Sequence, residues 1–186
     1  MRNKMKIEIQ ESTYILAVFL LFLIPLRWLI AWLIAIATHE FCHYISSKWL
    51  GGKILKLTIG VYGMKMDAVF MSEKRKVIAI LCGPLFGLFP VLFRSKFPEL
   101  AVCCWMLSLY NILPLPSLDG GNVLCVLCKN QRCVTVVRKI VLSMITLTGL
   151  LCTLVWHLGV LPLIAAVMLW IRNRKNPCQE SICEVQ

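Results

Sequence analysis

Charged residues are scarce in this chain of 186 residues, because Asp, Glu, Lys and Arg together make up only 16% of it. Hydrophobic residues account for 59%, compared with roughly 45–50% in soluble domains. The sequence has no polar stretch long enough for a separate soluble domain, and no internal repeat is visible. These absences exclude an ordinary soluble globular protein and predict a polytopic membrane protein.

Acidic residues are especially few, with 9 Asp and Glu against 20 Lys and Arg, which gives a net charge of +11. Such an excess can indicate nucleic-acid binding, but here the basic residues fall in short clusters between apolar runs. Membrane topology explains this distribution better, because cytoplasmic loops are enriched in Lys and Arg. We therefore expect the lipid bilayer as a partner and no nucleic acid.

The N-terminus lacks the small-residue cleavage site of a secretory signal peptide, so the first apolar run is expected to be retained. Residues 1–11 alternate apolar and polar side chains and predict a short strand. Six apolar runs then predict membrane-spanning helices. Some of the runs are short, but tilt of the helix or local thinning of the bilayer would let them span the membrane. The runs are residues 12–26, 28–47, 77–93, 97–113, 140–156 and 159–171.

Residues 53–71 interrupt this series, because their apolar side chains show a partial period of two among lysines and glycines. They predict a short membrane-associated β-hairpin that turns at residues 60–63. Residues 122–128 predict a short apolar helix, and residues 129–139 a basic segment before the fifth span. The predicted fold class is an all-α polytopic membrane protein with about six transmembrane helices, comprising a single membrane-embedded domain at 1–172 and a cytoplasmic tail at 173–186.

The distribution of Lys and Arg predicts the orientation of these spans. If the N-terminus is cytoplasmic, 17 of the 20 basic residues lie on the cytoplasmic side and 3 on the other. The positive-inside rule strongly favours this arrangement, which leaves both termini in the cytoplasm. The second span then exits to the cytoplasm just after His43, and the fourth just before Asp119. These two residues are therefore expected at the same membrane depth, near the cytoplasmic face.

The second apolar run carries an unusual polar cluster, His39-Glu40-Phe41-Cys42-His43. On a helix, residues i and i+4 are neighbours, so His39 and His43 can bind one metal ion. Zinc accepts imidazole nitrogen and keeps a position for water, whose proton a nearby carboxylate can accept. Glu40 is the candidate general base. On a soluble surface helix these side chains would simply be solvated, but inside a membrane they are costly and need partners.

Asp119 is the natural third ligand. It follows the fourth span, where Pro114-Leu115-Pro116 stops a regular helix. The two glycines after it allow close backbone approach, so its carboxylate can point back into the bundle. In a soluble protein an aspartate before Gly-Gly would by default be a turn residue. Because Asp119 and His43 are expected at the same membrane depth, a role for Asp119 as a metal ligand is favoured instead.

Three motifs in this order resemble the site-2 protease family of intramembrane zinc metalloproteases. They are His39-Glu40-Phe41-Cys42-His43, Gly83-Pro84, and the segment from Asn111 to Gly121 that reads NILPLPSLDGG. The resemblance covers nearly the whole chain, and the six-span layout is most similar to the stage IV sporulation protein FB group. It implies that His39, His43 and Asp119 bind Zn²⁺ and that Glu40 activates water.

The resemblance also implies a substrate and a location. The substrate would be a membrane-tethered protein, cut in or near a transmembrane segment, such as a pro-sigma factor, an anti-sigma factor or a signal-peptide remnant. The location would be the cell membrane or an internal membrane of the forespore type. The residues assigned to substrate binding are Gly83, Pro84, Gly87 and Asn111.

The sequence departs from the family pattern in three places. Cys42 stands where a glycine usually precedes the second histidine, and Gly87 stands where the family often has asparagine. The chain is also expected to lack the C-terminal regulatory domain of many relatives. Gly87 supports an alternative, in which the protein is a catalytically weak or inactive relative that acts as a membrane binding partner.

A different membrane metalloprotease, of the kind that processes prenylated proteins, also uses the HExxH pattern. Its third ligand is a glutamate on a later helix, whereas the only acidic residues after Asp119 are Glu180 and Glu184 in the tail. Among the ten cysteines, Cys125 and Cys128 could suggest a redox or metal pair, but a free cysteine on an apolar helix is expected to pack as a small hydrophobic side chain. A reducing compartment argues against disulfides.

Overall fold

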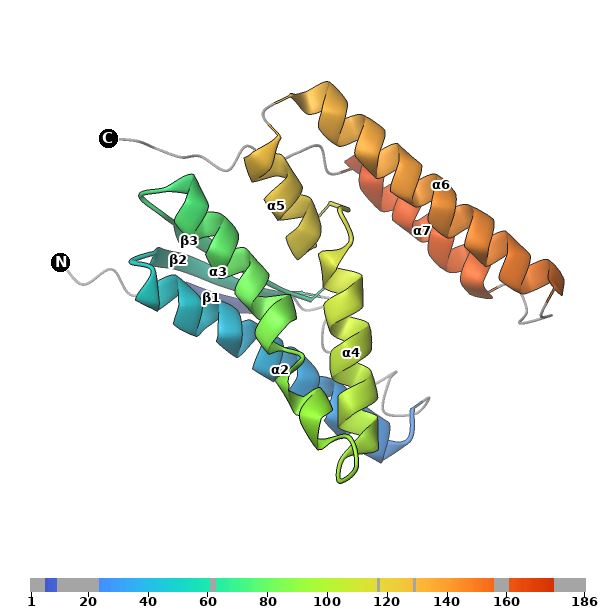
Figure 1. Ribbon diagram of the computed structural model, residues 1–186, viewed down its shortest axis with the longest axis horizontal. Coiled ribbons are helices and arrows are strands. Elements are labelled where there is room, and N and C mark those ends of the chain that lie inside the picture. The colour runs from blue at the N-terminus through green and yellow to red at the C-terminus, as the bar shows by residue number, and fades with distance from the viewer. Residues whose placement is uncertain are drawn as a thin grey trace. The chain divides into compact units, whose positions relative to one another are not determined.

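The computed structural model describes residues 6–9, 24–60, 63–116, 118–128, 130–155 and 161–175. These residues form three strands, six α-helices and one 3-10 helix (Figure 1). Most of the predicted first span, residues 12–26, lies outside the described residues. The described residues up to Tyr110 belong to one compact unit, and those from Asn111 onward belong to a second.

Helix α2, Leu26–Trp49, confirms the second predicted helix and extends it by two residues at each end. It begins after Pro25, and its 24 residues correspond to about 36 Å, enough to cross the roughly 30 Å hydrocarbon core of a bilayer. The helix ends before Gly51, whose φ of 76° lies in the left-handed region that glycine adopts without steric cost. The chain can therefore turn sharply from α2 into the sheet.

The hairpin predicted at residues 53–71 is confirmed as strands β2, Lys53–Gly60, and β3, Gly63–Val69, which pair antiparallel. The strand predicted near the N-terminus is also confirmed as β1, Lys6–Ile9. The sequence did not predict that β1 would pair with β2 in parallel, which makes a sheet of order β1-β2-β3. Among the described strands, β3 therefore has an unpaired edge.

The third predicted span, residues 77–93, divides into two elements. Helix α3, Glu73–Phe86, starts four residues earlier than predicted, and Glu73 places a negative charge at the positive end of the helix dipole. Pro84 lies inside α3, and after a turn the chain continues as the 3-10 helix η1, Phe89–Phe93. Helix α4, Pro98–Ile112, confirms a helix within the predicted run 97–113, and its first residue is a proline that favours helix initiation.

Small side chains form the core of this unit. Ala31 and Ala35 of α2 pack with Cys103 and Cys104 of α4, and all four are nearly inaccessible to solvent. Small residues let helix backbones approach closely, which is the common way of packing helices in a membrane. This contact fixes α4 beside the segment of α2 that precedes His39.

The second unit contains α5, Asp119–Leu127, α6, Gln131–Val155, and α7, Leu161–Lys175. Leu115, Leu118 and Leu142 form its buried core. The basic segment predicted at residues 129–139 is largely part of α6, because Arg and Lys are good helix formers that continue the helix toward its N-terminus. For the same reason α7 extends past the predicted span at 159–171 as far as Lys175.

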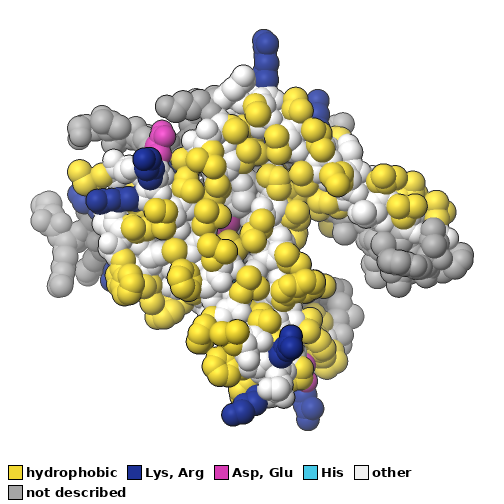
Figure 2. Space-filling model, in the orientation of Figure 1, with side chains coloured by type: hydrophobic (Ala, Val, Ile, Leu, Met, Phe, Trp, Pro, Cys, Tyr) yellow, Lys and Arg dark blue, Asp and Glu magenta, His cyan; other side chains and the backbone are white. Residues whose placement is uncertain are grey.

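Three helical segments among the described residues are long and apolar enough to cross a membrane: Leu26–Trp49, Glu73–Phe93 and Gln131–Leu151. Large hydrophobic side chains are exposed along these helices, and Figure 2 shows them covering much of the visible surface. Exposed apolar surface of this extent indicates contact with lipid rather than water. The protein is therefore a membrane protein, and the count of six spans stays a prediction.

Candidate metal centre

His39 and His43 lie one turn apart on α2 and face each other. Their Nε2 atoms are 3.2 Å apart, and their rings meet edge to face with centroids 4.8 Å apart. Only 3% of His39 and 8% of His43 is exposed. The helical spacing thus presents two buried imidazole nitrogens to a single point, as the sequence predicted.

Helix α3 sets the orientation of the His43 ring. The Nδ1 atom of His43 lies 3.0 Å from the backbone oxygen of Ala79. A carbonyl oxygen only accepts hydrogen bonds, so Nδ1 must carry the proton and donate it. The lone pair is then on Nε2, the nitrogen that faces His39. Hydrogen bonds of this kind are what orient metal-binding histidines.

Ser46 adds to the same arrangement. Its hydroxyl donates to the Ala79 oxygen at 3.2 Å and lies 3.1 Å from the backbone oxygen of His43. Ser46 is 8% exposed, so these hydrogen bonds are shielded from water. One backbone oxygen on α3 therefore holds both the ring of His43 and the next turn of α2.

Gly83 of α3 leaves the space that the His43 ring occupies. A Cβ atom on Gly83 would overlap the His43 ring, because the distance from this Cβ atom to His43 Cδ2 would be only 2.7 Å. Gly83 and Pro84 are both buried. The Gly83-Pro84 motif thus lies against the histidine pair through α3, which explains why a side chain is excluded at residue 83.

Asp119 is the first residue of α5 and is partly buried. Its backbone is held by the two glycines that follow. A Cβ atom on Gly120 would overlap the backbone oxygen of Ile112, and one on Gly121 would overlap the backbone oxygen of Leu115. The start of α5 therefore packs closely on the segment that ends α4, as the Gly-Gly pair suggested.

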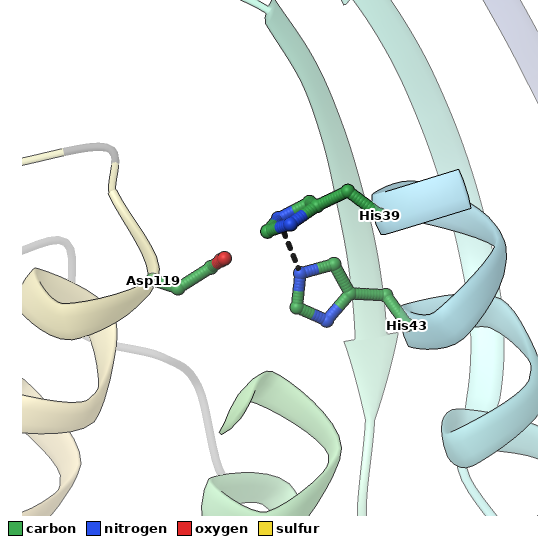
Figure 3. A group of neighbouring side chains, drawn as sticks. All are labelled: His39, His43 and Asp119. Carbon is green, nitrogen blue, oxygen red and sulfur yellow. Dashed lines mark hydrogen bonds between the residues drawn. The ribbon is translucent and has the colours of Figure 1, made fainter. Parts of the chain in front are cut away.

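His39, His43 and Asp119 form a group in which one ligand atom from each residue lies within 4.8 Å of the others (Figure 3). Zinc binds imidazole nitrogen at about 2.0–2.1 Å, so two such ligands around a tetrahedral ion are about 3.4 Å apart. The 3.2 Å between the two Nε2 atoms fits this value. Two imidazoles and one carboxylate leave a fourth position for water, which is the composition of a catalytic zinc site.

The other predicted site residues lie on the same elements. Glu40 follows His39 on α2 and is partly buried, and Asn111 is partly buried near the end of α4. Gly87 is buried and follows the last residue of α3. Its φ of −59° and ψ of −18° are values that any residue adopts, so glycine is not required there by backbone conformation. The roles of these residues in catalysis or substrate binding stay predictions.

Sequence reasoning missed Ser108 of α4, whose hydroxyl lies near the site. The only signal was a polar residue within the apolar run at 97–113. The expectation about cysteines was wrong at one position, because Cys125 of α5 is disulfide-bonded. A disulfide depends on which sulfur atoms the fold brings together, and residue spacing does not reveal that. Cys128 is free, as expected.

A comparison with solved structures identifies the fold. The structure is similar to that of the site-2 protease from Methanocaldococcus jannaschii, with a TM-score of 0.62 and 18% sequence identity. The similarity covers 100% of this chain and 95% of that one. No protein-family model and no curated protein sequence matches the chain. The described part of the chain therefore has the fold of a site-2 protease.

Proposed function

We propose that this protein is an intramembrane zinc metalloprotease of the site-2 type, which cleaves peptide bonds in or near transmembrane segments of membrane-tethered proteins. The grouping of His39, His43 and Asp119 carries the proposal, because it supplies a catalytic type of zinc ligand set. The fold shared with a site-2 protease supports it independently. Zinc is favoured because two imidazoles and a carboxylate are ligands that it binds readily.

In the proposed reaction, His39, His43 and Asp119 would hold Zn²⁺. When bound, the ion would lower the pKa of a water molecule to about 7 and polarise the substrate carbonyl. Glu40 takes the proton from the attacking water and passes it to the leaving amine. The proton of His43 stays on Nδ1, where the Ala79 oxygen accepts its hydrogen bond.

A transmembrane substrate helix must unwind before it can react, because its carbonyl groups are engaged in internal hydrogen bonds. Strand β3 offers an edge that is unpaired among the described strands. An unwound segment can add to this edge as a further strand, with its backbone held by main-chain hydrogen bonds. This places an extended peptide in the unit that carries the histidine pair.

In the proposed topology, the chain has six spans, both termini in the cytoplasm and an active site near the cytoplasmic face. The distribution of Lys and Arg supports that orientation. On this topology, substrates would be tethered proteins such as a pro-sigma factor, an anti-sigma factor or a signal-peptide remnant. The membrane would be the cell membrane or an internal membrane of the forespore type.

A second candidate is a catalytically weak or inactive relative that binds membrane partners. One observation favours it: Gly87 is buried beside the histidine pair and has no side chain to contact a substrate. Both candidates retain the zinc ligands, so zinc content alone does not separate them. Cleavage of a membrane-tethered reporter by the purified protein does.

The test uses the full chain in liposomes with a tethered reporter. Glu40→Gln should retain stoichiometric zinc and lower the cleavage rate about 100- to 10,000-fold, which is the range for loss of a general base. Glu73→Gln, the same substitution at an exposed residue at the start of α3, is the matched control and should cleave normally. Normal turnover by Glu40→Gln would show that another group takes the proton. A wild-type protein that binds zinc and leaves the reporter intact would favour the inactive relative.

A further inference from the structure

The second unit buries a positive charge that the proposed function does not use. Arg138 of α6 is only 7% exposed. Its Nε atom has no hydrogen-bond partner in the part of the chain that the structure describes. Asp119 is the only acidic residue among the described residues of this unit, and it stands at the start of α5. A buried cation is costly unless an opposite charge accompanies it, so Arg138 calls for an anion other than a carboxylate.

The group that Arg138 does contact is a sulfur atom. Its Nη2 atom donates a hydrogen bond to Sγ of Cys125 at 3.2 Å. Cys125 lies in the last turn of α5, is partly buried and is disulfide-bonded. A disulfide sulfur is neutral and accepts hydrogen bonds only weakly. Reduction to a thiolate would place on this same atom the negative charge that the buried guanidinium lacks.

This contact therefore favours the reduced state of Cys125 over the oxidised state. A disulfide becomes easier to reduce when its reduced form is stabilised, and a thiolate with a nearby cation also leaves faster during thiol–disulfide exchange. On the proposed topology, the basic segment at residues 129–139 places the junction of α5 and α6 at the cytoplasmic face. Disulfides in the cytosol are usually transient and serve catalysis or redox sensing.

We propose that the Cys125 disulfide is a redox-active site, which a cytosolic dithiol reduces and at which Arg138 stabilises the Cys125 thiolate that forms. One thiolate of the dithiol attacks the sulfur bonded to Cys125, and the electron pair of the broken S–S bond goes to Cys125 Sγ. The second thiol of the dithiol then attacks the mixed disulfide. The dithiol leaves as a disulfide after giving up two electrons and two protons, of which one proton goes to the released thiol and one to water.

Two further cysteines lie beside this site and serve as an internal reference. Cys128 follows the last residue of α5, and Cys133 lies in the first turn of α6. Both are free thiols, and a hydrogen bond joins their side chains. A reagent that blocks free thiols therefore marks Cys128 and Cys133 before and after reduction, whereas it marks Cys125 only after reduction.

The experiment equilibrates the purified full chain in detergent with mixtures of reduced and oxidised dithiothreitol. One alkylating reagent blocks the free thiols, the remaining disulfides are then reduced and labelled with a second reagent, and peptide mass spectrometry reads the state of Cys125. Arg138→Gln removes the charge and should make the Cys125 disulfide about 10-fold harder to reduce, which is about 30 mV for this two-electron couple. Arg138→Met should shift the equilibrium in the same direction, and its apolar side chain is compatible with burial.

Two variants separate the charge from the packing of this arginine. Arg138→Lys keeps a positive charge and should stay within about 3-fold of the wild type. Arg132→Gln is the matched control, because it makes the same substitution at an exposed arginine of α6, and it should behave like the wild type.

Equal reduction equilibria in the wild type, Arg138→Gln and Arg138→Met would overturn the proposal, because the guanidinium would not stabilise the thiolate. A Cys125 disulfide that opens only after denaturation would overturn it as well. The proposal rests on the proposed topology for its cytosolic reductant, but its readout is the oxidation state of sulfur. Failure of the proposed protease would instead appear as an intact reporter or absent zinc, with the reduction equilibrium unchanged.

Discussion

The imidazole side and the carboxylate side of the candidate metal centre are built in different ways. His39 and His43 come from adjacent turns of one long helix, are nearly fully buried, and are fixed by α3 through Ala79 and Gly83. Asp119 is partly buried and comes from the first turn of a nine-residue helix after a break at prolines. Helical periodicity alone therefore places the imidazoles, whereas the position of the carboxylate depends on where one helix ends and the next begins.

Removal of a metal ligand should have the largest effect on zinc binding, and the size of the loss should differ between an imidazole and the carboxylate. His43→Ala should reduce bound zinc to background after dialysis and abolish cleavage, because a single imidazole and a carboxylate hold the ion poorly. Asp119→Ala should leave weak residual binding, since both imidazoles remain on α2. Metal analysis of the dialysed proteins measures the difference. Full zinc occupancy in Asp119→Ala would remove that residue from the ligand set.

Substituting alanine for a glycine should reduce zinc affinity by an intermediate amount, depending on what the added methyl group contacts. Gly83→Ala places a Cβ within the His43 ring and should weaken zinc affinity about 10- to 100-fold, as for loss of an orienting partner. Gly121→Ala overlaps a backbone oxygen and no ligand. It should lower stability by about 1–3 kcal/mol, with a smaller change in zinc affinity. Chelator competition and thermal unfolding of both variants test this order, and a larger affinity loss in Gly121→Ala would reverse it.

The smallest effect is expected at Ser46. Ser46→Ala removes one of the two hydrogen bonds to the Ala79 oxygen and leaves that of His43 in place. The cost should be about 1 kcal/mol of stability, which is typical for one hydrogen bond, with zinc affinity nearly unchanged. Thermal unfolding of the zinc-loaded and zinc-free proteins checks it. A loss of zinc affinity as large as that of Gly83→Ala would mean that Ser46 itself orients the ring.

Patterns among neighbouring residues predicted the helices and strands that depend on those residues alone. Apolar runs predicted α2 and the helical region around α3, and alternation predicted β2 and β3. Helical spacing predicted that His39 and His43 face each other. The ends of α6 and α7 differ more from the prediction, because basic residues suggest boundaries in the sequence although they are good helix formers.

Some features that depend on distant residues were not predicted. Parallel pairing of β1 with β2 joins strands separated by more than 40 residues, and alternation within each strand does not specify its partner. The disulfide at Cys125 likewise depends on the folded positions of sulfur atoms. Ser108 was missed because a single serine in an apolar helix usually bonds to its own backbone.

Membrane insertion and the two imidazoles on one face of α2 could be predicted from the amino-acid sequence, because hydrophobicity and helical periodicity are properties of neighbouring residues. Which nitrogen of His43 carries a proton, and why residue 83 has no side chain, could be learned only from the folded structure. Those features arise where α2 and α3 touch, and packing between helices is not encoded in the spacing along any one of them.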